Sequence, residues 1–277
     1  MSLDQLQDDW TRLGAEDPLW AVYVAPGTKG GKWDVDAFFA LGRREVDGVF
    51  AEFTRLGIDP GRRRALDFGC GVGRLSQALA EHVDQVTGID ISPTMLEKAR
   101  ELDRSGGRCA YILNEASDLS VIESGSVDVV YSSLVLQHMP PEFARGYLKE
   151  FARVLAPGGV AAFQVASRPT MSLKGLVFRL APWPLLRWAQ QRLLGYPAPM
   201  RMSAMTSQDV ENAIAGTGAR LVAAVDDDSY GGHWHYTRYF VVAPGEVPPE
   251  RRGTTSAQVS ASRETPAPPA APAGPGA

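Results

Sequence analysis

Three glycines alternate with other residues between two aspartates in the first half of the chain. Gly69, Gly71 and Gly73 lie between Asp67, at the end of an apolar run, and Asp90, at the end of the next one. Glycine lets the backbone turn sharply and lets a ligand approach without a Cβ atom in the way. An acidic residue at the end of the second strand can accept hydrogen bonds from both hydroxyls of a ribose. The pattern therefore predicts a nucleoside-binding turn.

The residues around this turn exclude two common nucleotide sites. A dinucleotide-binding Gly-x-Gly-x-x-Gly pattern would need a glycine where the chain has Arg74. No phosphate-binding Gly-x-x-x-x-Gly-Lys-Ser/Thr stretch occurs. Asp67 would repel a pyrophosphate, but its charge suits a cationic amino acid. These features favour a nucleoside that carries an amino-acid group.

The acid-x-Gly-x-Gly-x-Gly pattern, followed by an acid at the next strand end, resembles class I S-adenosylmethionine-dependent methyltransferases. The turn at 153–159, Arg-Val-Leu-Ala-Pro-Gly-Gly, also matches, so the resemblance covers residues 64–166. It implies S-adenosylmethionine as cofactor and methyl transfer as the activity. In that family an acidic side chain after the third strand holds the adenine; Glu115 stands there, with Asp118 as the alternative. The cofactor-binding residues that it implies are Asp67, Phe68, Gly69, Gly71, Gly73, Asp90, Ile91, Met95, Glu115, Ala116, Ser132 and Ser133.

Alternating apolar strands and amphipathic helices predict an α/β chain. With the resemblance, we expect a Rossmann-like, seven-stranded, mostly parallel sheet whose last strand is antiparallel. Residues 1–60 are expected to form an N-terminal helical cap, either covering a sheet edge or closing as a lid, with Arg43 or Arg44 near the cofactor's carboxylate. Residues 61–244 would form the methyltransferase domain, with a helical insert at 167–205 after strand five, and the Pro/Ala-rich residues 245–277 would be disordered. Strands are predicted at 65–68, 85–89, 109–113, 127–132, 160–166 and 219–225 and from His235 or Tyr236 to Val242, and capped helices after Ser92 and Thr206.

Three histidines are candidate catalytic residues, because histidine accepts a proton at neutral pH when the methyl acceptor is a hydroxyl or a charged amine. His138 follows the fourth strand, where a loop-fixing hydrogen bond is its alternative role. His233 and His235 have the i, i+2 spacing that places both rings on one face of a strand. Because the sequence suggests no third ligand, we predict no metal site. The fourth histidine, His82, is assigned to a core helix.

The segment 171–194 combines leucines and tryptophans with basic residues. No acidic residue occurs from Phe151 to Gln208, which carry seven basic residues in a chain of net charge −4. Three interpretations stay open: a helical lid packed on the core, a pocket for an apolar or anionic acceptor, and a membrane-surface helix for a lipid-linked substrate. Pro182 and Pro184 weigh against the third.

The acceptor is expected to be a small molecule or a glycan or lipid-linked molecule, methylated at oxygen. The resembled family's base-methylating members carry Asn/Asp-Pro-Pro-aromatic after the fourth strand; this chain does not, and its pI near 5.6 argues against nucleic acid. The acidic metal ligands of catechol-type members are also missing. N- or C-methylation, and a cofactor-binding sensor or membrane-associated partner without methyl transfer, remain alternatives. The sequence does not decide the oligomeric state.

The chain begins without the basic-then-apolar pattern of a signal peptide and has no apolar run of about 20 residues. A cytoplasmic location is therefore expected. Cys70 and Cys109 are predicted to be reduced, buried thiols.

Overall fold

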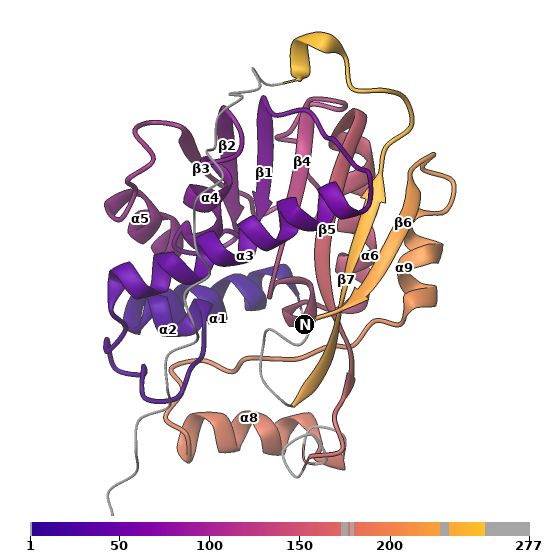
Figure 1. The fold of residues 1–277 in the computed structure, drawn as a ribbon. Coiled ribbons are helices and arrows are strands. Elements are labelled where there is room, and N and C mark those ends of the chain that lie inside the picture. Colours follow the sequence, from indigo (N-terminus) through magenta and orange to yellow (C-terminus); the bar gives the residue numbers. More distant parts are fainter. Residues whose placement is uncertain (1, 173–176, 178–179, 228–232, 253–277) are drawn as a thin grey trace, which may run out of the picture.

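The computed structural model describes residues 2–172, 177, 180–227 and 233–252, and in this part seven strands form a single sheet (Figure 1). The strand order is β3-β2-β1-β4-β5-β7-β6, and β7 runs antiparallel to both of its neighbours. The predicted sheet, with its antiparallel last strand, is confirmed. The strands are β1 (Arg64–Phe68), β2 (Gln85–Asp90), β3 (Cys109–Leu113), β4 (Val127–Ser132), β5 (Leu155–Pro169), β6 (Arg220–Asp226) and β7 (Trp234–Val242).

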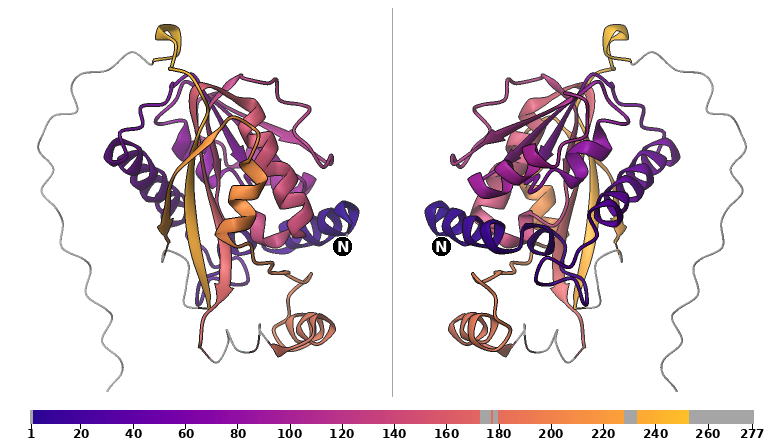
Figure 2. Two further views of the ribbon diagram at one scale, coloured as in Figure 1. Left: turned by 90° about the vertical axis from the view of Figure 1, so that its right-hand side faces the viewer. Right: turned by 90° about the vertical axis from the view of Figure 1, so that its left-hand side faces the viewer.

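Helices cover both faces of the sheet (Figure 2). Neighbouring side chains of a strand point to opposite faces, so Ala65 packs with the helices of one face and Leu66 with those of the other. The first face carries α3 (Val35–Arg55) and α4 (Arg74–Leu79), and the second carries α6 (Pro141–Val154) and α9 (Ser207–Ile214). The strand order reverses between β1 and β4, the place where ligands bind in open α/β sheets.

Two helices begin where the sequence predicts. In α5 (Pro93–Glu101) the Ser92 hydroxyl accepts a hydrogen bond from the Met95 N–H, and Pro93 occupies the first helical position. In α9 the hydroxyl of Thr206 accepts from the Asp209 N–H, while the Asp209 carboxylate accepts from the Thr206 N–H. Both caps rest on contacts three residues apart, which is why sequence alone finds them.

The N-terminal helices do more than cover a sheet edge. Helix α3 lies across the sheet, whereas α1 (Leu3–Glu16) and α2 (Pro18–Val22) lie near the carboxyl ends of the strands (Figure 1). A separate apolar cluster, which includes Leu13, Trp20 and Phe38, joins these three helices. Helix α8 (Trp183–Arg192), in the insert, lies beyond the same end of the sheet (Figure 1).

Three local predictions need correction. Strand β5 begins at Leu155 rather than at residue 160, because the predicted Pro-Gly-Gly turn is a bulge inside the strand, with Gly158 at φ +71°. His82 follows α4 instead of belonging to it, stacks on Phe50 and lies 2.8 Å from an Asp47 oxygen. Residues 245–252 are ordered, because the Arg251 guanidinium pairs at 3.0 Å with the buried carboxylate of Asp128; residues 253–277 lie outside the described part.

Both cysteines are free, Cys70 buried and Cys109 partly exposed, and burial raises the pKa of each thiol. Among the described helices, none has the length and apolar composition that crossing a bilayer requires.

Candidate cofactor and acceptor site

The glycine turn connects β1 to α4 through three left-handed residues. Gly69, Gly71 and Gly73 have φ of +75°, +52° and +77°, a region that residues with a Cβ rarely adopt. A Cβ at Gly69 would overlap Val135, and one at Gly71 would lie 2.6 Å from Val22 Cγ2. The turn therefore has two independent reasons to be glycine: its backbone angles, and the close approach of two neighbouring segments.

Asp90 fastens this turn to the end of β2. One carboxylate oxygen accepts from the Gly71 N–H at 2.8 Å, and the other accepts from the Ser92 N–H at 2.8 Å. Burial raises the pKa of Asp90, and these N–H donors counteract that shift. Each oxygen keeps a further lone pair. The carboxylate can therefore accept one hydroxyl on each oxygen, as the two hydroxyls of a ribose require.

Asp67 lies beneath the turn rather than at its surface. It is almost fully buried, and it accepts a hydrogen bond from the Ser76 hydroxyl at 2.6 Å. Burial raises the pKa of its carboxyl to about 7, against the Ser76 hydrogen bond and the charge of Arg74. This aspartate therefore braces the start of α4.

A cavity of about 1010 Å³ opens over the turn. Its walls come from the carboxyl ends of β1, β2, β3 and β4, from α1 and residues 21–26, and from the insert. Most of the lining side chains are apolar. The polar side chains among them are Arg74, Asp90, Asn114, Ser133, Gln137, His138, Gln190 and His233, with the aromatic Tyr23, Tyr147, Tyr196, Trp10, Trp234 and Tyr236.

Arg74 supplies a buried positive charge at this cavity. Its side chain is 2% exposed, its Nη1 lies 2.9 Å from Glu45 Oε2, and its guanidinium lies over the ring of Tyr23. Arg43 and Arg44, the arginines expected near a ligand carboxylate, are exposed and do not line the cavity. In the sequence, Arg74 serves only to exclude a dinucleotide site. Its position directly after the glycine turn could have indicated that its positive charge lies at the ligand site.

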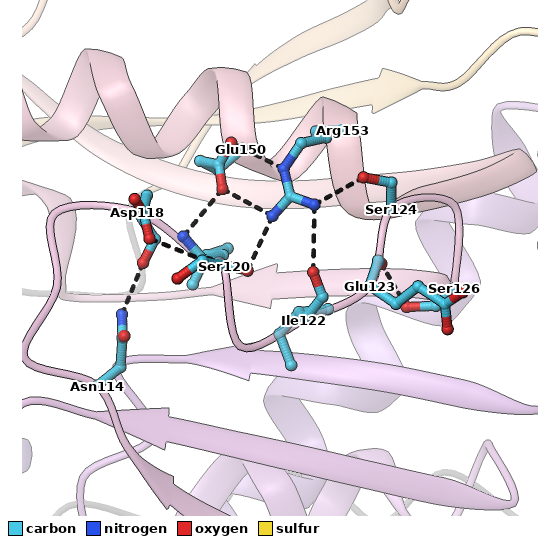
Figure 3. Close-up of polar contacts among 10 residues, drawn as sticks. Asn114, Asp118, Ser120, Ile122, Glu123, Ser124, Ser126, Glu150 and Arg153 are labelled. Carbon is cyan, nitrogen blue, oxygen red and sulfur yellow. Dashed lines mark hydrogen bonds and ion pairs between the residues drawn. The ribbon is translucent and has the colours of Figure 1, made fainter.

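Arg153 and Glu150 of α6 make polar contacts with the loop after β3 (Figure 3). The Arg153 guanidinium donates to the Leu119 and Ile122 carbonyls at 2.8 and 3.1 Å and pairs with Glu150. Asp118 accepts from the Ser120 N–H, and its pKa is lowered by this bond. The residue at the cavity wall is Asn114, whose Nδ2 donates to the Asp118 carbonyl at 2.9 Å.

The loop after β4 is strained and carries an unpaired amide. Leu134 has φ +62°, and its N–H donates to Gln164 Oε1 at 3.3 Å. Gln137 is 2% exposed, and neither polar atom of its amide has a hydrogen-bond partner in the described structure. Backbone strain and unpaired buried polar groups are costly, and they concentrate at ligand sites. This loop is therefore the part of the wall most suited to meet a polar group of a ligand.

His138 ends the short 3-10 helix η1 (Leu136–His138) in the same loop. Its Nδ1 lies 2.7 Å from the Arg201 carbonyl oxygen, and Trp10 packs edge-on against its ring at 5.2 Å. Because a carbonyl oxygen only accepts, Nδ1 carries the proton, and Nε2 of the neutral ring holds a lone pair. Burial lowers the pKa of His138 to about 4, so the ring is neutral at physiological pH.

A buried set of charges links the turn to this loop. Glu45 pairs with Arg74 and accepts from the Tyr131 hydroxyl at 2.7 Å, and it lies 3.8 Å from Arg238. Arg238 in turn pairs at 2.6 Å with Asp227, which accepts from the Gln164 amide at 2.9 Å. The Leu134 N–H completes the chain of contacts at Gln164. The same set of contacts thus supports both walls of the cavity.

Comparison with known proteins identifies the domain that carries this turn. A family model described as a methyltransferase domain matches residues 66–163, from β1 to the middle of β5. These residues form a class I S-adenosylmethionine-dependent methyltransferase domain. The predicted family is confirmed, and S-adenosylmethionine is the cofactor of this methyltransferase domain.

Curated relatives of this methyltransferase domain share about a third of its residues. The 2-methyl-6-phytyl-1,4-hydroquinone methyltransferase of Synechocystis sp. (strain ATCC 27184 / PCC 6803 / Kazusa) is 33% identical over 57% of this chain and 49% of its own length. The ubiquinone biosynthesis O-methyltransferase of Xanthomonas axonopodis pv. citri (strain 306) is 33% identical over 46% of this chain and 57% of its own. The chain therefore spans about half the length of the curated relatives it matches.

Solved structures support the methyltransferase fold. Magnesium protoporphyrin IX methyltransferase from Synechocystis PCC 6803 with bound SAH superposes with a TM-score of 0.58 at 20% identity, covering 86% of this chain and 98% of that one. The cyclase SpnF superposes with a TM-score of 0.54 at 18% identity, over 87% of this chain and 93% of its own. At these identities the likeness is one of fold alone.

The described residues fit the cofactor of this methyltransferase domain. The turn exposes backbone without a Cβ at Gly69 and Gly71, Asp90 has two acceptor oxygens, and Arg74 offers a buried cation. Of the predicted cofactor residues, those at the cavity wall are Phe68, Gly69, Gly71, Asp90, Ile91, Met95 and Ser133. Those away from it are Asp67, Gly73, Glu115, Ala116 and Ser132. The cofactor roles of both groups stay predictions.

The outer residues of this set have other partners. Glu115 is exposed and accepts from the Gln7 amide at 2.5 Å. The Ala116 carbonyl accepts from the Tyr147 hydroxyl at 2.6 Å, and the Ser132 hydroxyl donates to the Phe68 carbonyl at 3.0 Å. These three residues lie outside the cavity lining, and their contacts hold the segments that form its walls.

His233 and His235 differ in their surroundings. His233 lines the cavity, with its Nδ1 buried and unpaired in the described structure, whereas His235 is exposed and outside the cavity wall. Because β7 begins at Trp234, only His235 lies on the strand, and a common face for the two rings stays a prediction. The neighbouring Tyr230, Gly231 and Gly232 lie outside the described residues.

Proposed function

We propose that the chain transfers the methyl group of S-adenosylmethionine to an oxygen atom of an apolar small molecule. The observation that carries this proposal is the cavity: about 1010 Å³, mostly apolar, and continuous from Asp90 to Gln137 and His138. Pockets for one small ligand usually measure about 300–1,000 Å³, so this cavity lies at the upper end of that range. The cavity therefore has room for a cofactor and an acceptor together.

The polar groups of the cavity divide into two sets. Asp90 and the glycine turn suit a ribose, and the buried guanidinium of Arg74 suits the carboxylate of an amino acid. Gln137 and His138 lie in the loop after β4 and suit the reacting end of the acceptor. The apolar side chains of α1, residues 21–26 and the insert would surround the rest of it.

When bound, S-adenosylmethionine supplies an electrophilic methyl group on its sulfonium. The cavity walls hold the acceptor in line and keep water away. His138 Nε2 accepts a hydrogen bond from the acceptor hydroxyl, since Nδ1–H is fixed on the Arg201 carbonyl. It takes the proton as the new C–O bond makes that oxygen positively charged, so a ring of low pKa suffices, and S-adenosylhomocysteine is the leaving group. Gln137 orients that oxygen through its free amide. This assigns the predicted catalytic role to His138; His233 is a second candidate because it shares the cavity.

The matched relatives favour this class of acceptor. One is named for a phytyl hydroquinone, and the other for O-methylation in ubiquinone biosynthesis. The first name joins a hydroquinone to an apolar phytyl group, which agrees with the polar loop and apolar walls here, and the second supplies the precedent for methylation at oxygen. The magnesium protoporphyrin methyltransferase shares only the fold.

Two measurements test the proposal. Calorimetry should show S-adenosylmethionine binding that Gly71→Trp and Asp90→Ala both abolish. A panel of apolar phenols and hydroquinones should then yield S-adenosylhomocysteine and an O-methylated product by mass spectrometry, and His138→Gln should lower kcat while cofactor affinity stays unchanged.

Binding without methyl transfer is the alternative, because the fold alone does not decide activity: SpnF is named a cyclase. Cofactor binding with no S-adenosylhomocysteine from the phenol panel or from cell extract supplied with methyl-labelled donor would favour it. Labelled product methylated at nitrogen or carbon would instead refute the oxygen assignment.

A further inference from the structure

Helix α8 presents two different faces. At about 100° per residue, Leu186 and Ala189 fall on one side and line the cavity. Leu185 and Trp188 fall toward the other side and are more than half exposed, and Arg192 is exposed beside them. The helix is therefore a wall of the cavity on its inside and an apolar surface on its outside.

Exposed apolar residues concentrate in this insert. Seven of the ten exposed large hydrophobic residues in the described part lie between residues 167 and 205, and five of the seven do not line the cavity: Met171, Leu180, Leu185, Trp188 and Leu193. Met171, Leu180 and Leu193 are each more than two-thirds exposed. Scattered exposed apolar residues are ordinary on a protein surface, but a group of this kind marks a contact site.

The charge of the segment indicates what the contact is. Residues 151–208 contain seven basic residues and no acidic one, although the chain as a whole is acidic. Arg187 and Arg192 are exposed on α8 itself. A short helix with tryptophan and leucine beside arginines matches the headgroup region of an anionic bilayer, which takes both apolar side chains and positive charge.

The prolines do not oppose this assignment. Pro182 is the residue before the first turn of α8, and Pro184 lies within that turn, where a missing N–H leaves no helical hydrogen bond unmade. They start the helix instead of breaking it, and residues 183–192 remain available as one amphipathic unit.

We propose that the outer face of α8, formed by Leu185, Arg187, Trp188 and Arg192, docks on an anionic lipid bilayer. Its inner face would then hold the cavity against the bilayer surface, so that an apolar acceptor passes between lipid and cavity. Only this last step rests on the proposed methyl transfer. The docking itself is measurable without any acceptor.

Vesicle co-sedimentation of the full chain tests the docking. The chain should sediment with phosphatidylcholine vesicles that contain 30% phosphatidylglycerol, and binding should weaken as salt is raised. Arg187→Gln with Arg192→Gln should reduce the partition constant by about 30-fold, from roughly fivefold for each charge near the surface. Leu185→Gln with Trp188→Gln should also reduce it.

The matched control is Arg63→Gln with Arg64→Gln. It removes the same charge from exposed residues at the start of β1, at the opposite end of the sheet from α8 (Figure 1), and should leave partition nearly unchanged. Because Arg187 lies near Asp9 of α1, calorimetry with S-adenosylmethionine should confirm an intact site in each variant.

Equal partition onto neutral and anionic vesicles, no partition at all, or loss in the control alone would overturn the docking proposal. Self-association through α8 in ultracentrifugation, with no vesicle binding, would also overturn it; none of these results bears on cofactor binding or turnover.

Discussion

Replacing Gln137 by methionine is expected to stabilise the free protein and to weaken acceptor binding. The Gln137 amide is buried with both polar atoms unpaired in the described structure, which costs about 1–3 kcal/mol. Methionine is unbranched and of similar length, and such a change costs less than about 1.5 kcal/mol in repacking. The free energy of unfolding should rise by about 1 kcal/mol, or about 2–4 °C in melting temperature at this chain length.

The acceptor should respond in the opposite direction. If the amide hydrogen-bonds the acceptor, losing that bond costs about 1–3 kcal/mol, so KM for the acceptor should rise about 5- to 150-fold. Cofactor affinity should not change.

Gln164→Met is the matched control for stability. Gln164 is equally buried, but its amide bonds both the Leu134 N–H and Asp227, so its removal should destabilise the chain. Urea unfolding gives the free energy of unfolding of the parent, Gln137→Met and Gln164→Met, and the values are comparable when the three proteins have equal m-values. If Gln137→Met destabilises as much as Gln164→Met, the amide of Gln137 has a partner, and the reasoning is wrong.

Three further predictions concern buried charge. Burial raises the pKa of Asp67 to about 7 from an ordinary value of 3.8, so ionisation of this carboxyl opposes folding. Between pH 4 and 7, the free energy of unfolding of the parent protein, measured in urea, should therefore fall by up to about 4 kcal/mol relative to that of Asp67→Asn. Parallel curves of stability against pH for the two proteins would contradict this. Glu45→Ala removes a carboxylate partner of two buried guanidinium groups, those of Arg74 and Arg238, and should lower the free energy of unfolding by about 3–5 kcal/mol. Glu52→Ala, which removes an exposed ion pair, should change it little. Equal shifts in melting temperature for the two variants would argue against a structural role for Glu45. Since the pKa of His138 is lowered to about 4, kcat/KM should stay constant between pH 8 and 5.5. A fall in kcat/KM below about pH 6.5 that disappears in His138→Gln would show that this ring becomes protonated near that pH, and it would refute the assignment of a neutral, buried His138.

The cofactor half of the site was predictable because its signals are local. The glycine turn, Asp90 at the next strand end and the capped start of α5 are each set by residues a few positions apart. Local geometry of this kind leaves a mark in the sequence, since glycine, proline and hydroxyl side chains each have a specific backbone role. The seven-stranded sheet with its antiparallel last strand followed from the family resemblance.

The acceptor half depends on segments that are distant in the sequence. Nothing near Gln137 reveals that its amide is unpaired, since that follows from which side chains pack around it. The burial of Arg74 likewise depends on Glu45 from α3, which precedes it by a whole strand. The composition of residues 245–252 predicts disorder, because it does not show that Arg251 pairs with Asp128, which is more than a hundred residues away in the sequence.

The departures from ordinary folding rules gather in one place. Leu134 has a left-handed backbone, Gln137 has an unpaired buried amide, and Asp90 has a raised pKa, all at the cavity wall. Each of these features reduces stability when considered alone, and none is needed to build the sheet. Proteins keep such features where a ligand will meet them, since a prepared site is costly until it is filled. Their convergence on the carboxyl ends of β2 and β4 is therefore independent of the sequence comparisons, and it points to the same cavity.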